Sequence, residues 1–346
     1  MAWSWNPLDN STDVREGATV AVATARHIDA AAVGPVDVIV GAWTGRDNQT
    51  CVLAGFVSTQ ASGPAPTPRW TWRLPGCALD LVSGDVDRLF DISDDGSTVA
   101  MGVVAAPPGG GGGAAVPQLI WLDAQTGARG GAYSPPAAAP GLMSVSLARD
   151  GARLAWVLGT SVYVVDRATG ALVGGAPVNR TWQSTAIICP MGHFLAFGTA
   201  AGATVLAWNG TAFAPHTLLP GTLPDGTAWQ AETLAISVNG GPTGGPDGCL
   251  ISVGWSNRQD GATQAWLSVT SLLTGKLYIN WRTDVSNKAL QDVPSVAVHM
   301  GYTALATWGD GSGPGTPGQL RYPTVLLFHI TEGSSPLFRC ARTRGR

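Results

Sequence analysis

Four asparagines of this 346-residue chain stand in the spacing that accepts N-linked glycans. Asn10, Asn48, Asn179 and Asn209 each begin an Asn-x-Ser/Thr triplet, in which the asparagine side chain is the group that takes the sugar. All four lie in predicted turns, where a sugar-transferring enzyme has access. The set therefore favours a secreted chain, and an intracellular chain with chance triplets is the alternative reading.

Two proline-rich stretches add hydroxyl groups that could carry O-linked sugars. The first covers 64–68 and contains Thr67, and the second covers 134–140 and begins at Ser134. A polyproline-like backbone exposes its side chains fully. We therefore predict O-glycosylation at Thr67 and Ser134, as a weaker signal that agrees with the four triplets.

No group of residues in the sequence fixes a reaction. Asp91, Asp94, Asp95 and Asp310 could converge as the paired carboxylates of a glycoside-cleaving enzyme. Turn capping is the preferred interpretation of these aspartates, because an aspartate oxygen readily accepts hydrogen bonds from turn backbone. The histidines, of which there are 5, show no metal-ligand spacing. The sequence predicts no catalytic residue, no cofactor and no metal.

Composition narrows the class of protein. Hydrophobic residues make up 45% and charged residues only 12%, with 46 glycines and 24 prolines, which is typical of a folded chain with many short strands and turns. A net charge of −3 argues against a nucleic-acid partner. No apolar run is long enough to span a bilayer. The first residues lack the pattern of a secretion signal, so we interpret the sequence as a mature chain or a segment of a longer precursor.

A repeat of strands and turns positions these residues. Its clearest copy has an apolar run, an Asp-Gly turn, a second run ending at Trp156, and a third run over 161–170. Repeats of this size indicate a stacked or closed array of small sheets. The recurring turn motifs are Ser93-Asp-Asp-Gly96, Arg149-Asp-Gly151, Trp121-Leu-Asp-Ala-Gln-Thr-Gly127, Asp166-Arg-Ala-Thr-Gly170 and Leu273-Thr-Gly275.

These motifs resemble the repeats of β-propellers of the WD40-like and quinoprotein-like type. The resemblance implies an all-β fold of four-stranded blades, in which Asp-Gly turns join the first two strands and Asp-x-x-Thr-Gly turns join the last two. The Trp-Asp ending of true WD repeats is absent, so their adaptor role does not follow. We predict six blades, with seven as the alternative, at 19–74, 88–133, 144–174, 184–218, 232–281 and 295–339.

The whole chain is predicted to be one propeller domain. It divides into an outer strand and linker at 1–16, six blades within 17–340, and a basic tail at 341–346. The segment Ala2-Trp-Ser-Trp5 matches the fourth strands of two other blades. We expect it to complete a blade of this chain. Membership of a missing seventh blade and addition to another subunit stay open.

Aromatic residues recur at equivalent positions of the second and third strands. We interpret both columns as packing between blades. Stacking on a sugar is an alternative only for residues at loop mouths, such as Trp182 and Trp229. The second-strand column is Trp43, Met101, Trp156, Phe197, Trp255 and Trp308; the third-strand column is Phe56, Trp121, Tyr163, Trp208, Trp266 and Phe328.

The repeat also suggests how the cysteines pair. Cys51 opens the third strand of blade one and Cys77 follows the fourth, so antiparallel pairing would place them opposite each other. Cys189 and Cys249 fall at the same face of neighbouring blades and form the second candidate pair. Cys340 is left unpaired or intermolecular. Five reduced thiols are the alternative.

These observations lead to one functional hypothesis and two alternatives. The hypothesis is an extracellular or cell-surface glycosylated propeller with a structural or interaction role, which includes a place as a subunit of a larger or filamentous assembly. Its partners would be other protein subunits, or further copies of itself, and covalent glycans, with no nucleic acid and no membrane span. The alternatives are a secreted carbohydrate-active enzyme with aspartates at the propeller mouth, and an intracellular propeller scaffold.

Overall fold

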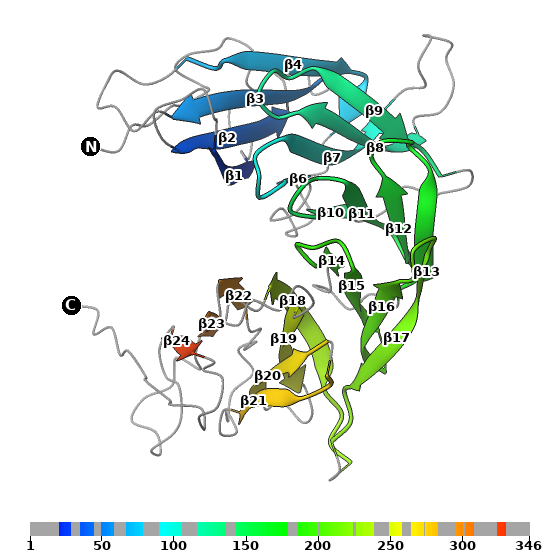
Figure 1. The fold of residues 1–346 in the computed structure, drawn as a ribbon, viewed down its shortest axis with the longest axis vertical. Helices are drawn as coiled ribbons and strands as arrows, with labels where there is room; N and C mark the ends of the chain where they lie inside the picture. The colour runs from blue at the N-terminus through cyan, green and yellow to red at the C-terminus, as the bar shows by residue number, and fades with distance from the viewer. Residues whose placement is uncertain are drawn as a thin grey trace, which may run out of the picture. The chain divides into compact units, whose positions relative to one another are not determined.

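The fold comes from a computed structural model, shown in Figure 1. The described residues are 21–28, 35–44, 50–58, 67–78, 90–105, 116–135, 143–178, 186–199, 201–223, 226–238, 249–257, 264–272, 274–282, 295–299, 302–307 and 324–329. They form strands β1 to β24 and, within these ranges, no helix. The chain divides into two compact halves, residues 1–176 and 177–346, which are described separately.

The N-terminal half contains three antiparallel sheets, which correspond to predicted blades one to three. In blades one and three the strands pair in chain order, with the first and fourth at the edges. The strands of blade one are β1 (Ala21–Ile28), β2 (Pro35–Thr44), β3 (Thr50–Ser58) and β4 (Trp70–Pro75). Those of blade three are β10 (Met143–Leu147), β11 (Arg153–Leu158), β12 (Ser161–Asp166) and β13 (Leu172–Pro177).

Blade two differs because its first strand is in two pieces. Both β5 (Cys77–Ala78) and β6 (Phe90–Ile92) pair with β7 (Thr98–Ala105), and β8 (Val116–Asp123) and β9 (Arg129–Tyr133) complete the sheet. The chain therefore enters blade two at Cys77, immediately after the last strand of blade one. The repeat motifs predict a later start for this blade, near residue 88, because they contain no sign of the two-residue strand β5.

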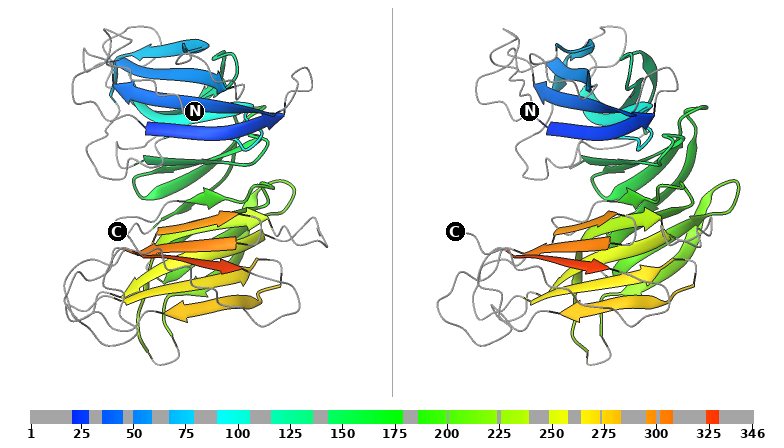
Figure 2. Two further views of the ribbon diagram at one scale, coloured as in Figure 1. Left: turned by 90° about the vertical axis from the view of Figure 1, so that its left-hand side faces the viewer. Right: turned by 60° about the vertical axis from the view of Figure 1, so that its left-hand side comes forward.

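The C-terminal half also contains three antiparallel sheets in chain order. Figure 2 shows the last of them, in orange to red, as a meander of three strands. Blade four has β14 (Ile187–Ile188), β15 (Phe194–Thr199), β16 (Gly202–Trp208) and β17 (Phe213–Pro220). Blade five has β18 (Gln230–Val238), β19 (Cys249–Asn257), β20 (Gln264–Ser271) and β21 (Leu277–Arg282). Blade six has β22 (Ser295–His299), β23 (Tyr302–Thr307) and β24 (Thr324–His329).

Apolar side chains fill the space between neighbouring blades within each half. Trp121 of blade two and Trp156 of blade three belong to one buried cluster, and Trp255 and Trp266 of blade five join residues of blade four in another. The two tryptophans of blade five are stacked, with ring centroids 4.8 Å apart. Burial of such large rings is a main source of stability. The described members of the aromatic columns are thus buried as expected, except that Tyr163 and Trp208 are only half-buried, and Trp308 lies outside the described residues.

Glycines allow the predicted turns to form. Gly127 ends the Asp-x-x-Thr-Gly turn of blade two with φ +72°, and a Cβ there would lie 2.7 Å from the ring of Trp70. A residue with a side chain would be strained at that φ and would also collide with the ring. The Trp70 indole N–H donates to the carbonyl of Ala124 in the same turn at 2.9 Å. This hydrogen bond and the contact with the Trp70 ring hold β4 of blade one against the turn of blade two.

Several predicted elements lie outside the described residues. These are the segment at 2–5, the fourth strand of blade six at 336–339, and the basic tail at 341–346. A seventh blade and the closing role of the segment at 2–5 therefore stay predictions. Within the described ranges, no helix has the length and apolar character needed to cross a bilayer.

Candidate functional site

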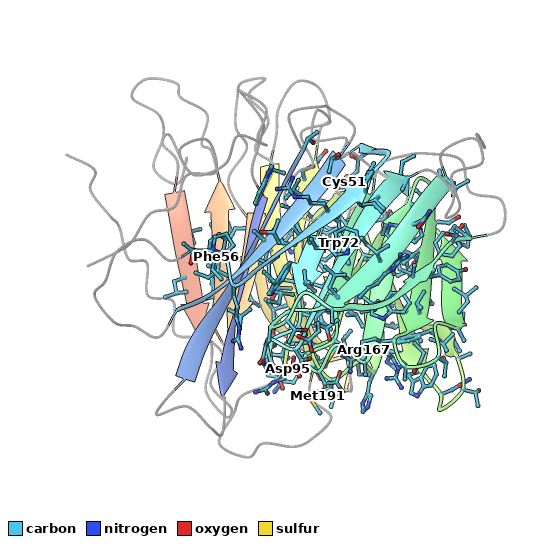
Figure 3. All side chains as sticks on the ribbon, turned by 90° about the horizontal axis from the view of Figure 1, so that it is seen from above. Cys51, Phe56, Trp72, Asp95, Arg167 and Met191 are labelled. Atoms are coloured by element: carbon cyan, nitrogen blue, oxygen red, sulfur yellow. A yellow bond between two sulfur atoms is a disulfide. The ribbon has the colours of Figure 1, made fainter. Side chains whose placement is uncertain are left out.

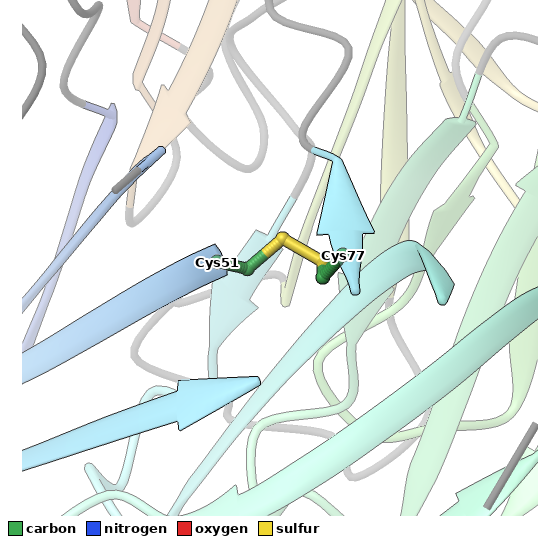
Figure 4. The surroundings of a disulfide bond; sticks show 2 residues. All are labelled: Cys51 and Cys77. Carbon is green, nitrogen blue, oxygen red and sulfur yellow. A yellow bond between two sulfur atoms is a disulfide. The ribbon is translucent and has the colours of Figure 1, made fainter. Parts of the chain in front are cut away.

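A disulfide between Cys51 and Cys77 joins blade one to blade two. Figure 4 shows Cys51 at the beginning of β3 and Cys77 on the short strand β5. The Cα atoms are 5.4 Å apart, within the range that a disulfide spans. The cysteines are those that the sequence paired, but the reasoning was wrong: residue 51 lies opposite Leu74, whereas residue 77 pairs with Ala105 in the next sheet.

A second disulfide, between Cys189 and Cys249, joins blade four to blade five. Residue 189 follows β14 and residue 249 begins β19, and both side chains are buried. The Cα–Cα distance is 6.6 Å. Each described half thus contains one covalent link between neighbouring blades. Such a link constrains the unfolded chain and so stabilises the folded one.

Asn209 caps the turn between β16 and β17. Its side-chain Oδ1 accepts hydrogen bonds from the Thr211 N–H at 3.0 Å, the Thr211 hydroxyl at 3.0 Å and the Ala212 N–H at 2.9 Å. The residue is exposed, and its Nδ2 has no hydrogen-bond partner among the described residues. The amide nitrogen that a glycan would occupy is therefore free while the oxygen holds the turn.

Aspartates cap the equivalent turns of two other blades. In blade two, Oδ1 of Asp123 accepts from the backbone N–H of Thr126 at 2.8 Å and from its hydroxyl at 2.9 Å. In blade three, Oδ1 of Asp166 accepts from Thr169 in the same way, at 2.9 and 2.8 Å. These bonds lower the pKa of Asp166, and burial opposes the shift. The aspartates therefore act as turn caps in the Asp-x-x-Thr-Gly motifs of blades two and three.

Asp91 and Asp95 belong to a hydrogen-bonded network in the N-terminal half. Both carboxylate oxygens of Asp91 accept backbone N–H groups at 2.9 Å, one from Ile92 and one from Leu147 of blade three. The carboxylate of Asp95 accepts from the Ser93 hydroxyl at 2.6 Å. The Asp91 carboxylate thus links blade two to blade three. The Asp95 carboxylate caps its own turn through Ser93 and Ser97. Both roles support the capping interpretation over a catalytic pair.

Arg167 completes this network from blade three. Its guanidinium donates to the Thr98 hydroxyl of blade two and also acts on Asp95 through its charge. Figure 3 labels Arg167 and Asp95. Burial alone would raise the pKa of Asp95, but hydrogen bonds from Ser93 and Ser97 and the charge of Arg167 together lower it. Sequence analysis missed Arg167, although its place after the turn-capping aspartate in the Asp-x-x-Thr-Gly motif was a usable signal.

Two outer strands lack the charges that usually protect a sheet edge. The sequence of β13 is Leu-Val-Gly-Gly-Ala-Pro and that of β17 is Phe-Ala-Pro-His-Thr-Leu-Leu-Pro. Each is the last strand of its sheet, and Leu172 and Leu218 on them are 49% and 48% exposed. Natural proteins commonly place lysine or other charged residues on such edges. These strands are therefore suited to contact another protein.

The remaining predicted residues divide into described and undescribed positions. Thr67 and Ser134 are exposed, as O-glycosylation requires. Trp229 is buried and packs edge-on against Trp266 with centroids 5.7 Å apart, so the suggestion that it stacks on a sugar was wrong. Outside the described residues lie Asn10, Asn48, Asn179, Trp182, Asp310 and Cys340.

Comparison with known proteins finds similarity in structure only. No protein-family model matches the chain, and no curated protein matches its sequence. Similar solved structures include the Cps50 (Swd1) β-propeller domain of Myceliophteria thermophila, with 11% identity, a TM-score of 0.44, and coverage of 71% of this chain and 65% of that one. The hydrazine synthase of Kuenenia stuttgartiensis matches with 14% identity and a TM-score of 0.44, over 71% of this chain and 64% of that one. The Dos1 propeller matches with 14% identity and a TM-score of 0.45, over 78% of this chain and 62% of that one. The matches span less than two thirds of each compared chain.

The chain is an all-β protein of the β-propeller class. That assignment stands on its own sheets, which are successive antiparallel meanders with the turn motifs of propeller blades. Among the described residues, no group of three or more histidines, cysteines, aspartates and glutamates is placed to hold a metal ion. The described features with functional meaning are the blade-joining disulfides, the Asn209 turn and the uncharged outer strands.

Proposed function

We propose that the protein is an extracellular or cell-surface glycoprotein whose propeller has a structural or interaction role. The observation that carries the proposal is the pair of disulfides between blades. Disulfides form and persist in oxidising compartments and are rare in the reducing cytosol. All four cysteines are buried, so reducing agents reach them slowly in the folded state. Such links are uncommon in an intracellular scaffold, which favours the extracellular alternative.

The outer strands support an interaction role. Strands β13 and β17 offer backbone edges and exposed leucines without charged side chains. An exposed edge of this kind can pair with a strand of another chain. Further copies of this chain or other subunits of a larger assembly are the proposed partners, with glycans at the four asparagine triplets and at Thr67 and Ser134.

The enzyme alternative has less support. A catalytic carboxylate pair needs one group free to donate a proton and one free to attack or to activate water. The carboxylate of Asp91 instead accepts backbone hydrogen bonds through both oxygens, and Asp95 is held by Ser93 and Ser97. A structural role fits these contacts better.

Secretion of the full chain from a eukaryotic cell line tests the proposal. Intact mass without reduction should show two disulfides and attached glycans, and light scattering should show particles larger than a monomer. Leu172→Asp should reduce assembly, because it charges the edge of β13. Ala168→Asp, at an exposed turn position of the same blade, is the matched control and should assemble normally. A monomer at every concentration would refute the assembly role, and fully reduced thiols would refute the extracellular one.

A further inference from the structure

The turn between β16 and β17 differs from its equivalents in a way that creates a modification site. In blades two and three the cap and its threonine are three residues apart, as in Asp123 and Thr126. In blade four the cap is an asparagine and the threonine is two residues away, at Asn209 and Thr211. The same oxygen-to-threonine contacts are kept in the shorter turn. The shortening and the amide together produce the spacing of a glycan acceptor.

The geometry of this turn allows the modification without loss of the cap. A glycan is attached through Nδ2, whereas the turn is held through Oδ1. The turn is closed further by a backbone hydrogen bond from Asn209 to Ala212 at 3.0 Å. Space is also available, because a Cβ placed on Gly210 would meet no atom within 4 Å. Residues 209 to 211 are all exposed.

We propose that Asn209 carries an N-linked glycan in the folded protein and that the glycan keeps this turn of blade four out of subunit contacts. In the transfer, the amide nitrogen forms a bond to the anomeric carbon of a sugar on a lipid diphosphate. The bond between that carbon and the diphosphate oxygen breaks, the diphosphate leaves with the electron pair, and the amide loses one proton. The inference rests on the proposed extracellular function. It concerns one of the four triplets, at Asn209, and one surface, the turn between β16 and β17.

Three variants of the full chain, secreted from a glycosylating cell, test the site. Asn209→Asp should lose the mass of one glycan and keep the turn, because aspartate is the cap in blades two and three. Thr211→Ser should keep the glycan, since serine supplies the same hydroxyl. Asp166→Asn should gain no mass, because its threonine is one residue too far along the chain to complete a triplet.

Occupancy is measured by removing N-glycans with an amidase that converts each glycosylated asparagine to aspartate, followed by peptide mass spectrometry. Residue 209 should be converted in most molecules. Release from this residue should need no denaturation and should not change the size of any assembly.

The results separate this inference from the proposed function. If residue 209 is unoccupied while the other triplets are occupied, the inference fails and the extracellular function stands. If the glycan is released only after dissociation of subunits, the turn lies in a contact and the second part fails. If no triplet is occupied and the thiols are reduced, both proposals fail.

Discussion

Removal of the Cys51–Cys77 disulfide should lower the free energy of unfolding by about 3.5 kcal/mol at 25 °C, because the separation of 26 residues sets the chain entropy that the link removes from the unfolded state. The same relation gives about 4.3 kcal/mol for the Cys189–Cys249 pair, whose separation is 60 residues. The variant with Cys189→Ala and Cys249→Ala should therefore lose more stability than that with Cys51→Ala and Cys77→Ala.

Guanidinium unfolding followed by far-ultraviolet circular dichroism measures both losses. Cys340→Ala serves as the control, since it removes a cysteine but leaves both links in place. Hydrogen exchange should localise the first loss to β3 and β7 and the second to β15 and β19, because stability in a repeat array depends on neighbouring interfaces. A loss below about 1 kcal/mol in both double variants, against the typical 2–4, would refute the idea that these links hold neighbouring blades together.

Three further predictions follow from single contacts. Asp91→Ala removes the carboxylate acceptor of two amides and should cost about 1–3 kcal/mol by denaturant titration. Because the pKa of Asp95 is lowered in the folded protein, its charge stabilises the fold above about pH 4. This stabilisation is lost as the pH falls through the folded pKa. The melting temperature of Asp95→Asn should therefore fall less steeply in acid than that of the unchanged protein. Gly127→Ala should cost more than Gly159→Ala, because both positions have positive φ but only the first meets the ring of Trp70; equal losses would show that the ring contact contributes nothing.

The regular strands were predictable because they follow local rules. Strands β11 (Arg153–Leu158) and β12 (Ser161–Asp166) lie between the Asp-Gly turn at 149–151 and the Thr-Gly turn at 166–170, where the repeat predicts strands. An Asp-Gly turn and a Thr-Gly turn set where strands begin and end, and the information lies within a few residues. The cap of Asp166 is local in the same way, because the threonine that it binds is three residues along the chain.

The elements that sequence reasoning missed depend on distant partners. Strand β5 has two residues, and its existence depends on pairing with β7 after an intervening segment. Trp229 precedes β18 and packs against Trp266 of β20, which is 37 positions further along the chain. The side-chain contact of Arg167 with Thr98 joins residues 69 positions apart. A pattern of neighbouring residues carries no information about contacts between residues so far apart in the chain. For the same reason the sequence paired Cys51 with Cys77 correctly but placed Cys77 in the wrong sheet.

The position of the disulfides has a mechanical consequence. If the chain is pulled from its two ends, the 26 residues spanned by the first link and the 60 spanned by the second cannot extend until a sulfur–sulfur bond is broken. At about 3.4 Å per extended residue, roughly 90 Å and 200 Å of contour length are withheld under tension. Under load, the chain would therefore lose individual strands while the disulfide between each pair of linked blades still limits how far they separate.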